Sequence, residues 1–135
     1  MSTLDDCKKP FHKHLMVRGH GVTPPRETHE AITWLAGLVQ FLGMKILQGP
    51  FSSYVDEPGN EGITAVVMIE TSHIAFHVWD AEDPSLVQFD VYTCGSLDVP
   101  SVMDRVIGFF GLRTYEYLVY DRENGFELIE STKVG

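Results

Sequence analysis

The sequence predicts an α+β fold: a two-layer sandwich in which two helices cover one face of a mostly antiparallel sheet. Two segments carry apolar residues at helical spacing and are bounded by capping and stop residues. Shorter segments between and around them are apolar or alternating and are separated by turn residues. The expected order along the chain is β-α-β-β-β-β-α-β-β, with short turns between several neighbouring strands.

The expected strands are short runs rich in β-branched and aromatic residues. They occupy residues 12–19, 44–49, 63–70, 72–79, 86–94, 114–120 and 126–130. The first is expected to end at the turn Gly19–His20–Gly21, and the last two to form a hairpin closed by "DRENG". Residues 50–62 are expected to form a loop, because proline, glycine and polar residues dominate them.

The first helix is expected within "TPPRETHEAITWLAGLVQFLG", residues 23–43. Thr23 suits the N-cap position, the two prolines after it suit the first turn, and Glu27 suits the positive end of the helix dipole. Gly43 should end the helix. The apolar stripe of this helix consists of Ile32, Leu35, Leu38, Val39 and Leu42.

The second helix is expected from Asp98 to Phe110. Asp98 should cap it, Pro100 suits its first turn, and Gly111 should end it. Its apolar stripe consists of Val102, Met103, Val106, Ile107 and Phe110. Helices of this kind should cover one face of the sheet, and an apolar opposite face would need a partner sheet, which favours a dimer.

Length and charge limit the possible function. A single domain over residues 1–135 is expected. The formal net charge of −9 opposes contact with phosphate backbones, so no nucleic-acid partner is expected. No apolar run approaches the ~20 residues of a membrane span, and the polar start lacks the apolar core of a signal peptide. Two cysteines, Cys7 and Cys94, provide no disulfide framework, and a cytoplasmic location fits.

The segment "TSHIAFHVW" carries more polar chemistry than a core strand needs. Alternation places Ile74, Phe76 and Val78 on one face and His73, Ala75, His77 and Trp79 on the other. These residues alone fit a half-buried strand with two hydrogen-bonded histidines. On the next strand, one face carries Gln88, Asp90, Tyr92 and Cys94. Adjoining strands would make Ser72, His77 and Cys94 neighbours, a set suited to nucleophilic and proton-transfer chemistry.

Two other site types fit less well. The chain has no Gly-x-Ser-x-Gly motif, and its fold is not the parallel sheet of a serine hydrolase. Cys7, His12, His14 and His20 are close in sequence, but they lack the paired ligand spacing of a structural zinc site, so no metal is expected.

The segments "SHIAFHVW" and "FDVYTCG" resemble the S-adenosylmethionine decarboxylase proenzymes, in particular the small bacterial and archaeal type. "GITAVVMI" resembles that family's Gly-Val-Ser-Gly strand, with Thr64 at the serine, and "HKHLMV" resembles its opening strand. The likeness covers about residues 12–120. The residues that match the family pattern best are Ser72, His73, His77, Asp90, Val91, Tyr92, Thr93, Cys94 and Gly95.

The resemblance implies a self-cleaving enzyme. The chain would break between Thr71 and Ser72, and Ser72 would become a covalent pyruvoyl cofactor that forms a Schiff base with the substrate amine. His77 and Thr64 would assist cleavage, and Cys94 would protonate the carbanion left by carbon dioxide. The implied activity is decarboxylation of S-adenosylmethionine for polyamine (spermidine) biosynthesis, in a homodimer with an α/β/β/α arrangement.

The chain departs from the family pattern around substrate recognition. Thr71 replaces the usual glutamate before the serine. The turn "DAEDPS" is two residues longer than the family's, so Asp80, Glu82 or Asp83 would take the place of its ribose-binding glutamate. The residues expected to contact substrate are Phe51, Tyr54, His73 and Glu82. Three alternatives stay open: a pyruvoyl-dependent ornithine or arginine decarboxylase, an uncleaved homologue that binds a ligand or partner, and an unrelated small ligand-binding domain.

Overall fold

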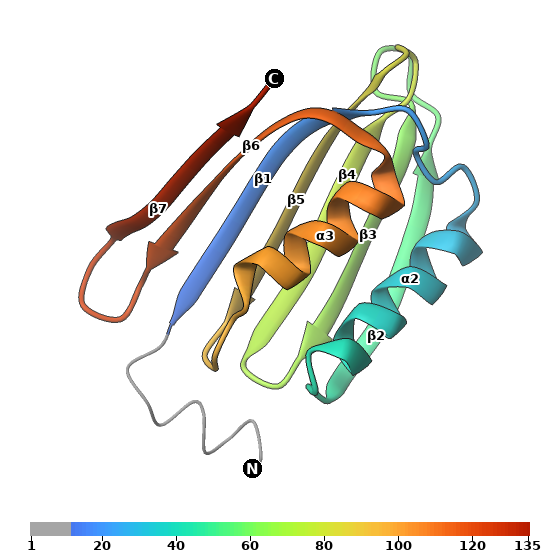
Figure 1. Cartoon of the computed structure of the whole chain (residues 1–135). Coiled ribbons are helices and arrows are strands. Elements are labelled where there is room, and N and C mark those ends of the chain that lie inside the picture. The colour runs from blue at the N-terminus through green and yellow to red at the C-terminus, as the bar shows by residue number, and fades with distance from the viewer. Residues whose placement is uncertain (1–11) are drawn as a thin grey trace.

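The computed structural model describes residues 12–135 and confirms the predicted order of helices and strands. All of its elements belong to one sheet with two helices (Figure 1). The elements are β1 (Lys13–Gly21), α2 (Thr28–Phe41), β2 (Ile46–Val55), β3 (Gly62–Ile69), β4 (Ser72–Trp79), β5 (Ser85–Thr93), α3 (Val99–Phe110), β6 (Leu112–Asp121) and β7 (Glu127–Val134).

The sheet has seven strands in the order β2-β3-β4-β5-β1-β6-β7, and all neighbours run antiparallel. The first strand therefore lies between β5 and β6, in the interior of the sheet. This insertion brings the start of the described chain beside β5. As a result, β1 adjoins β5 and lies one strand away from β4, although both come much later in the sequence.

Both helices pack on the same face of the sheet, and the core lies between the two layers (Figure 1). Side chains of alternate strand residues fill this layer, because alternate residues point to the same face. A cluster of aromatic rings lies within it: Trp34 of α2 stacks on Phe109 of α3 at 4.3 Å, and the rings of Phe76 and Phe110 meet edge to face at 5.0 Å. The expected helix stripes are confirmed for the buried residues Leu35, Leu38, Val39, Val102, Met103, Val106 and Phe110. The other expected members, Ile32, Leu42 and Ile107, are only half-buried.

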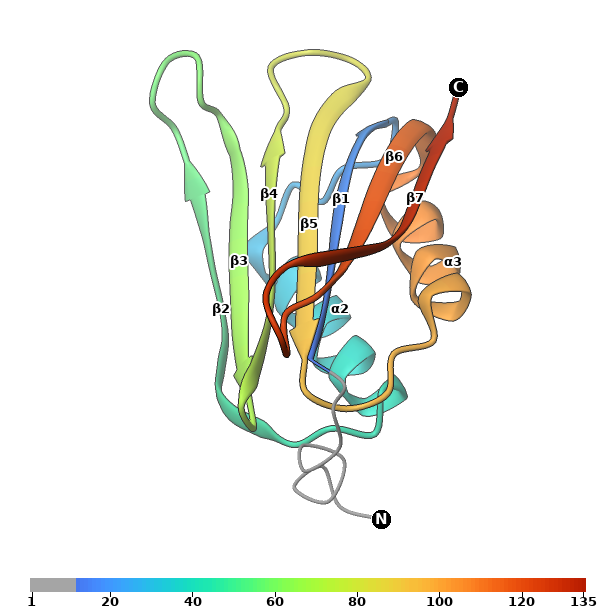
Figure 2. The same cartoon turned by 90° about the vertical axis from the view of Figure 1, so that its left-hand side faces the viewer.

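The opposite face of the sheet, which we call the open face, is covered by neither of the two helices found among residues 12–135 (Figure 2). Large apolar side chains project from it, among them Phe51, Val66 and Met68 with 56%, 37% and 46% of their surface exposed. Beyond β6, the last strand bends across part of this face, as Figure 2 shows. The face is thus apolar in part and uncovered by the chain's own helices.

The expected loop over 50–62 is wrong for its first part, because β2 continues to Val55. β2 is an edge strand, and its pairing with β3 shifts between Gln48 and Phe51. An edge strand tolerates proline and glycine, which have no place in a central ladder. Composition alone therefore made Pro50 and the serines after it resemble a loop.

The expected turn at Gly19–His20–Gly21 is also wrong, since β1 runs on to Gly21. The two glycines permit close approach rather than a turn. A Cβ atom on Gly19 would lie 2.7 Å from the carbonyl oxygen of Thr114, and one on Gly21 would overlap the carbonyl of Phe110. Without side chains, β1 can lie against the start of β6 and the end of α3.

The first helix begins later than expected, at Thr28, with Glu27 at the N-cap position. Thr23 does not cap it, because the Thr23 hydroxyl donates a hydrogen bond to the carbonyl of Phe109 instead. The carboxylate of Glu30 accepts one from the Glu27 amide at 3.1 Å, which satisfies an amide of the first turn. The second helix follows expectation, with Asp98 at its N-cap and Gly111 at its end in the left-handed conformation, φ 62°.

No helix among residues 12–135 combines the length and apolar character that crossing a bilayer requires.

Candidate active site

A tight turn joins β3 to β4 at the expected cleavage site. Ile69 and Ser72 are paired across the two strands, so only Glu70 and Thr71 form the turn. Thr71 has φ 57°, and among residues 12–135 it is the one residue other than glycine with a positive φ. A β-branched side chain is a strong outlier in this region, and the left-handed conformation costs roughly 1–2 kcal/mol. Backbone strain therefore lies directly before the Thr71–Ser72 peptide bond.

Thr71 also contacts the cysteine that was expected in the site. Its Oγ1 lies 2.7 Å from the carbonyl oxygen of Glu70 and 2.6 Å from Sγ of Cys94. Cys94 is 3% exposed and, against the expectation from two cysteines, is disulfide-bonded in this structure. Cys7, the other cysteine, lies outside the described residues. Cys94 can donate a proton only when the disulfide is reduced to the thiol.

His77 does not lie beside Ser72, so the expected grouping of Ser72, His77 and Cys94 is wrong within one chain. Ser72 pairs with Ile69, whereas His77 pairs with Thr64, five residues further along β4. At ~3.3 Å per residue the two are about 16 Å apart. They also point to opposite faces, because their positions differ by five, an odd number. The short strand motif placed them close in sequence, but extended backbone separates them.

His77 instead forms a pair with Thr64 on the open face. Oγ1 of Thr64 lies 3.2 Å from Nδ1 of His77, and the two residues are directly opposite in register. The imidazole also lies near the Trp79 ring, with centroids 6.1 Å apart. The two residues that the family resemblance assigned to assisting cleavage are thus brought together, at a distance from the bond they would act on.

A second histidine group does lie close to the cleavage site. Oδ2 of Asp90, on β5, accepts hydrogen bonds from Nε2 of His14 at 2.7 Å and from Nε2 of His73 at 2.9 Å. Burial on its own raises the pKa of Asp90, but the two imidazole hydrogen bonds outweigh burial and lower that pKa to about 2. Asp90 is therefore a carboxylate at neutral pH, held between β1 and β4.

We call this group the His14–Asp90–His73 network. Its ligand atoms are engaged in hydrogen bonds rather than arranged for a metal ion. Its three ligand atoms lie within 4.8 Å of one another, close enough for a metal ion. However, Nη1 of Arg122 lies 3.3 Å from Nδ1 of His14. Arginine only donates, so Nδ1 accepts and the His14 proton sits on Nε2, toward Asp90. Metal-bound histidines instead donate from their second nitrogen, and the guanidinium would repel a cation.

Sequence reasoning missed this network, although it placed Asp90 and His73 on exposed faces of neighbouring strands. The missing partner was β1, whose His14 lies opposite Tyr92 on β5. His73 lies opposite the same tyrosine from the other side. His14 alone gave little indication of a site, because its hydrogen-bond partner Asp90 lies 76 residues away in the sequence.

The expected substrate-contacting residues do not form one group. Phe51 lies opposite Val66 and so on the open face, whereas Tyr54, three residues on, points to the helix side. The Tyr54 hydroxyl lies 3.1 Å from both carboxylate oxygens of Asp80. Asp80 is also 3.7 Å from Arg26, and its side chain is 6% exposed. Glu82 is exposed in the turn after β4, so Asp80 is the ordered carboxylate of this region.

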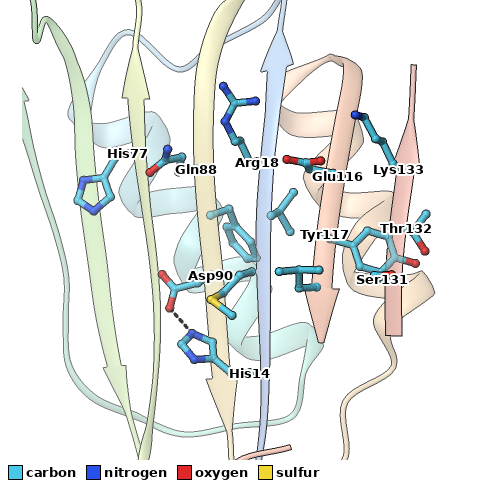
Figure 3. Close-up of a pocket in the computed structure, with 14 residues that line it drawn as sticks. His14, Arg18, His77, Gln88, Asp90, Glu116, Tyr117, Ser131, Thr132 and Lys133 are labelled. Carbon is cyan, nitrogen blue, oxygen red and sulfur yellow. Dashed lines mark hydrogen bonds and ion pairs between the residues drawn. The ribbon is translucent and has the colours of Figure 1, made fainter. Parts of the chain in front are cut away.

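A cavity of about 860 Å³ lies on the open face (Figure 3). A row of polar side chains crosses it, one from each of five adjacent strands: His77, Gln88, Arg18, Glu116 and Lys133. His14 and Asp90 line the same cavity, and Figure 3 shows their hydrogen bond below that row. The cavity thus connects the Thr64–His77 pair with the histidine network near Ser72.

The family model and the most similar relatives that we compared all point to one protein family. The family model described as S-adenosylmethionine decarboxylase matches residues 13–123. The chain is 29% identical over 90 residues to the S-adenosylmethionine decarboxylase proenzyme of Persephonella marina, a match that covers 65% of the chain and 63% of that relative. It is 32% identical over 62 residues to the proenzyme of Archaeoglobus fulgidus, which covers 45% and 54%. The matched part thus spans less than two thirds of these relatives.

Solved structures agree with this assignment. The adenosylmethionine decarboxylase of Aquifex aeolicus superposes with a TM-score of 0.65 at 25% identity, over 90% of this chain and 97% of that one. The AdoMetDC-delta26 monomer of Trypanosoma brucei gives 0.54 at 16% identity, over 80% and 45%, which supports the fold alone. From the family model, the fold and the residues around Ser72, the chain belongs to the S-adenosylmethionine decarboxylase family.

Proposed function

We propose that the protein is a self-cleaving, pyruvoyl-dependent decarboxylase that acts on S-adenosylmethionine. The observation that carries this proposal is the strained Thr71, which places an unfavourable backbone conformation directly before Ser72. A turn with a purely structural role would favour glycine at this position, because glycine adopts a positive φ without penalty. Family membership supports the substrate class.

The residues present fit the formation of a pyruvoyl group. The Ser72 hydroxyl oxygen attacks the Thr71 carbonyl carbon, the peptide C–N bond breaks, and the amine takes up a proton, which leaves an ester. Loss of the Ser72 α-proton then breaks the Cβ–O bond and releases Thr71 as a carboxylate. Water converts the remaining dehydroalanine to a terminal ketone with loss of ammonia. Cleavage frees Thr71 from its left-handed conformation, so the strain of roughly 1–2 kcal/mol favours the forward direction.

When formed, the pyruvoyl group supplies an electron sink for the electrons left by carbon dioxide. The chain's own residues would hold and protonate the substrate around it. Cys94, as a reduced thiol next to Thr71, is the proposed proton donor. Asp80, ordered by Tyr54 and Arg26, is the proposed carboxylate for polar groups of the substrate. It lies eight residues after Ser72, about 26 Å away along the strand, so it would reach this substrate only from the partner copy. Phe51, exposed on the open face, is the proposed contact for an aromatic ring.

The separation of His77 from Ser72 supports a homodimer. A side chain about 16 Å away cannot transfer a proton to or from the Ser72 hydroxyl, since such transfer needs hydrogen-bond distance. Two copies packed through their open faces would bury Phe51, Val66 and Met68 and give the α/β/β/α arrangement. A two-fold axis that reverses the strand direction would set the Thr64–His77 pair of one copy against the Ser72 end of the other.

A second candidate is an uncleaved homologue that binds a ligand or a partner protein. The disulfide at Cys94 favours it, because an oxidised sulfur has no proton to donate. Thr71 in place of the family's glutamate points the same way. Both features lie at the turn between β3 and β4, where Thr71 contacts Cys94. The two candidate functions differ in whether the Thr71–Ser72 bond breaks.

Carbon dioxide release tests the proposed activity. Purified protein is incubated under reducing conditions with S-adenosylmethionine, ornithine or arginine, and Ser72→Ala protein serves as the matched control. We expect release from S-adenosylmethionine with the wild-type chain and none with Ser72→Ala. Carbon dioxide release from ornithine or arginine alone would identify that amino acid, and not S-adenosylmethionine, as the substrate. Equal release from wild type and Ser72→Ala would reject the pyruvoyl mechanism.

A further inference from the structure

Breaking the Thr71–Ser72 bond creates a positioning problem for this fold. In the intact chain the two-residue turn ties the start of β4 to the end of β3. After cleavage, residue 72 becomes a chain terminus, and termini of strands fray unless something holds them. Thr71 stays with the β3 fragment, so its side-chain contacts, with the Glu70 carbonyl and Sγ of Cys94, no longer restrain residue 72. The reactive ketone therefore needs an anchor of its own within β4.

The first side chain after the break supplies such an anchor. His73 donates from Nε2 to Oδ2 of Asp90 at 2.9 Å. Asp90 lies in β5, an interior strand, so it is held by ladders to both β4 and β1. The side chain of His73 is 39% exposed, so it was not needed to fill the core. Its hydrogen bond joins the future end of β4 to the middle of the sheet.

The acceptor is itself fixed from the opposite side. His14 donates to the same Oδ2 at 2.7 Å, and Arg122 donates to the second nitrogen of His14. Arg122 also lies over the Tyr92 ring, 4.2 Å from its centroid. These groups form a series of hydrogen bonds: Arg122 donates to His14, and His14 and His73 both donate to Asp90. Asp90 is therefore a charged acceptor. Charged acceptors make the stronger hydrogen bonds in proteins.

We propose that Asp90 is a positioning residue, which acts through His73 to hold the new end of β4 and its ketone in place after the chain has broken. This role rests on the proposed function, because it requires cleavage at Ser72. It differs from a stabilising role in its timing. Before cleavage the turn already holds the start of β4, so the hydrogen bond should matter little to that segment. After cleavage it should be the main side-chain restraint, beside the backbone ladders that β4 forms with β3 and β5.

Hydrogen exchange in cleaved and uncleaved protein separates these roles. The readout is the protection of amides at 73–75 relative to those at 77–79 of the same strand, which cancels any change in global stability. In cleaved protein, Asp90→Ala should lower this ratio ~10-fold or more. In a Ser72→Ala background, which cannot be cleaved, Asp90→Ala should leave the ratio within about 2-fold. An equal loss in both backgrounds, or no loss in cleaved protein, would overturn the proposal.

Turnover provides an independent readout. Asp90→Ala should still be cleaved, but its carbon dioxide release per ketone should fall ~10²-fold, the size of effect expected for a reacting group displaced by about 1 Å. His14→Ala is the matched control, because it leaves the His73–Asp90 hydrogen bond in place and should lose much less. His73→Ala removes the same bond as Asp90→Ala, so the double variant should be no slower than either single one.

The remaining outcomes are also decisive. If Asp90→Ala does not fold, His73→Ala carries the exchange and turnover tests. If both variants fold and neither is cleaved, Asp90 acts before the break and the proposal is wrong. If they are cleaved and release carbon dioxide at the wild-type rate per ketone, the proposal is wrong while the proposed function stands. If the wild-type chain itself stays uncleaved, the proposed function and this inference fail together.

Discussion

At the residue scale, Thr71 is the unusual feature of the site. Its positive φ is unfavourable for a β-branched residue, and its side chain contacts Cys94 and the carbonyl of Glu70. Strain held in this way persists only where the surrounding structure enforces it. Here the pairing of Ile69 with Ser72 enforces it, since it leaves only two residues for the turn.

Replacing Thr71 separates strain from hydroxyl chemistry. Thr71→Gly removes the strain, so we expect cleavage to slow ~5- to 30-fold, the equivalent of roughly 1–2 kcal/mol. Thr71→Ala is the control, because it removes the hydroxyl but keeps a side chain that disfavours positive φ. The measurement is the rate of appearance of the two fragments after synthesis. A glycine variant that is cleaved as fast as wild type would show that the strain has no role.

Cys94 should matter after the chain breaks. As a reduced thiol, it is the proposed proton donor to the carbanion, and loss of a positioned donor typically costs ~10²–10⁴-fold in rate. Cys94→Ala should therefore be cleaved yet release carbon dioxide slowly per ketone, and wild-type protein should be active only with reductant. If Cys94 is simply a packed side chain, the alanine variant will match reduced wild type in turnover and lose a little stability.

At the scale of elements, the sequence predicted the type and order of every helix and strand described, because each has a clear period or apolar run. The paired strands 72–79 and 86–94 were predicted almost to the residue. The position of β1 between β5 and β6 was not, because pairing between distant segments leaves no local signal. His14 consequently entered the site only through the structure. The prediction ended the edge strand β2 too early, because Pro50 and the serines after it resemble a loop in composition.

Two glycines test why β1 fits where it does. Gly19→Ala would place a Cβ atom 2.7 Å from the Thr114 carbonyl oxygen and 2.9 Å from the Tyr115 Cβ, so β1 or β6 must move. We expect a loss of ~1–3 kcal/mol in the free energy of unfolding, as for other overpacked sites. Gly108→Ala is the control: nothing lies within 4 Å of its Cβ position in α3, and alanine there should stabilise by up to ~1 kcal/mol. Urea denaturation gives both values, and equal stability of the two variants would contradict this packing.

At the scale of the whole molecule, the open face and the distance between Ser72 and His77 lead to the same expectation. The chain should act as a dimer in which each copy completes the other's cleavage site. The sequence named both groups of residues as candidates. It did not predict their separation, because the alternation of a strand specifies a face and not the distance at which two residues can react.

Mixing two inactive chains tests this arrangement. His77→Ala and Ser72→Ala should each remain largely uncleaved when produced alone. When the two are produced together, a mixed dimer contains one site that combines an intact Ser72 with the partner's intact imidazole. We expect cleavage of the His77→Ala chain to return in that mixture, as measured by the mass of its fragments. Absence of cleavage in mixed dimers of demonstrated composition would place His77 outside the cleavage step.

The central claim is that Ser72 is a cofactor precursor, and the mass of the intact purified protein tests it most directly. We expect two chains, residues 1–71 and residues 72–135, with the second lighter than its sequence by the change from an N-terminal serine to a pyruvoyl group. Ser72→Ala should give a single full-length mass and a folded protein, because Ser72 does not fill the core. A single full-length mass for the wild-type chain after prolonged incubation with reductant would contradict the account and favour the uncleaved homologue.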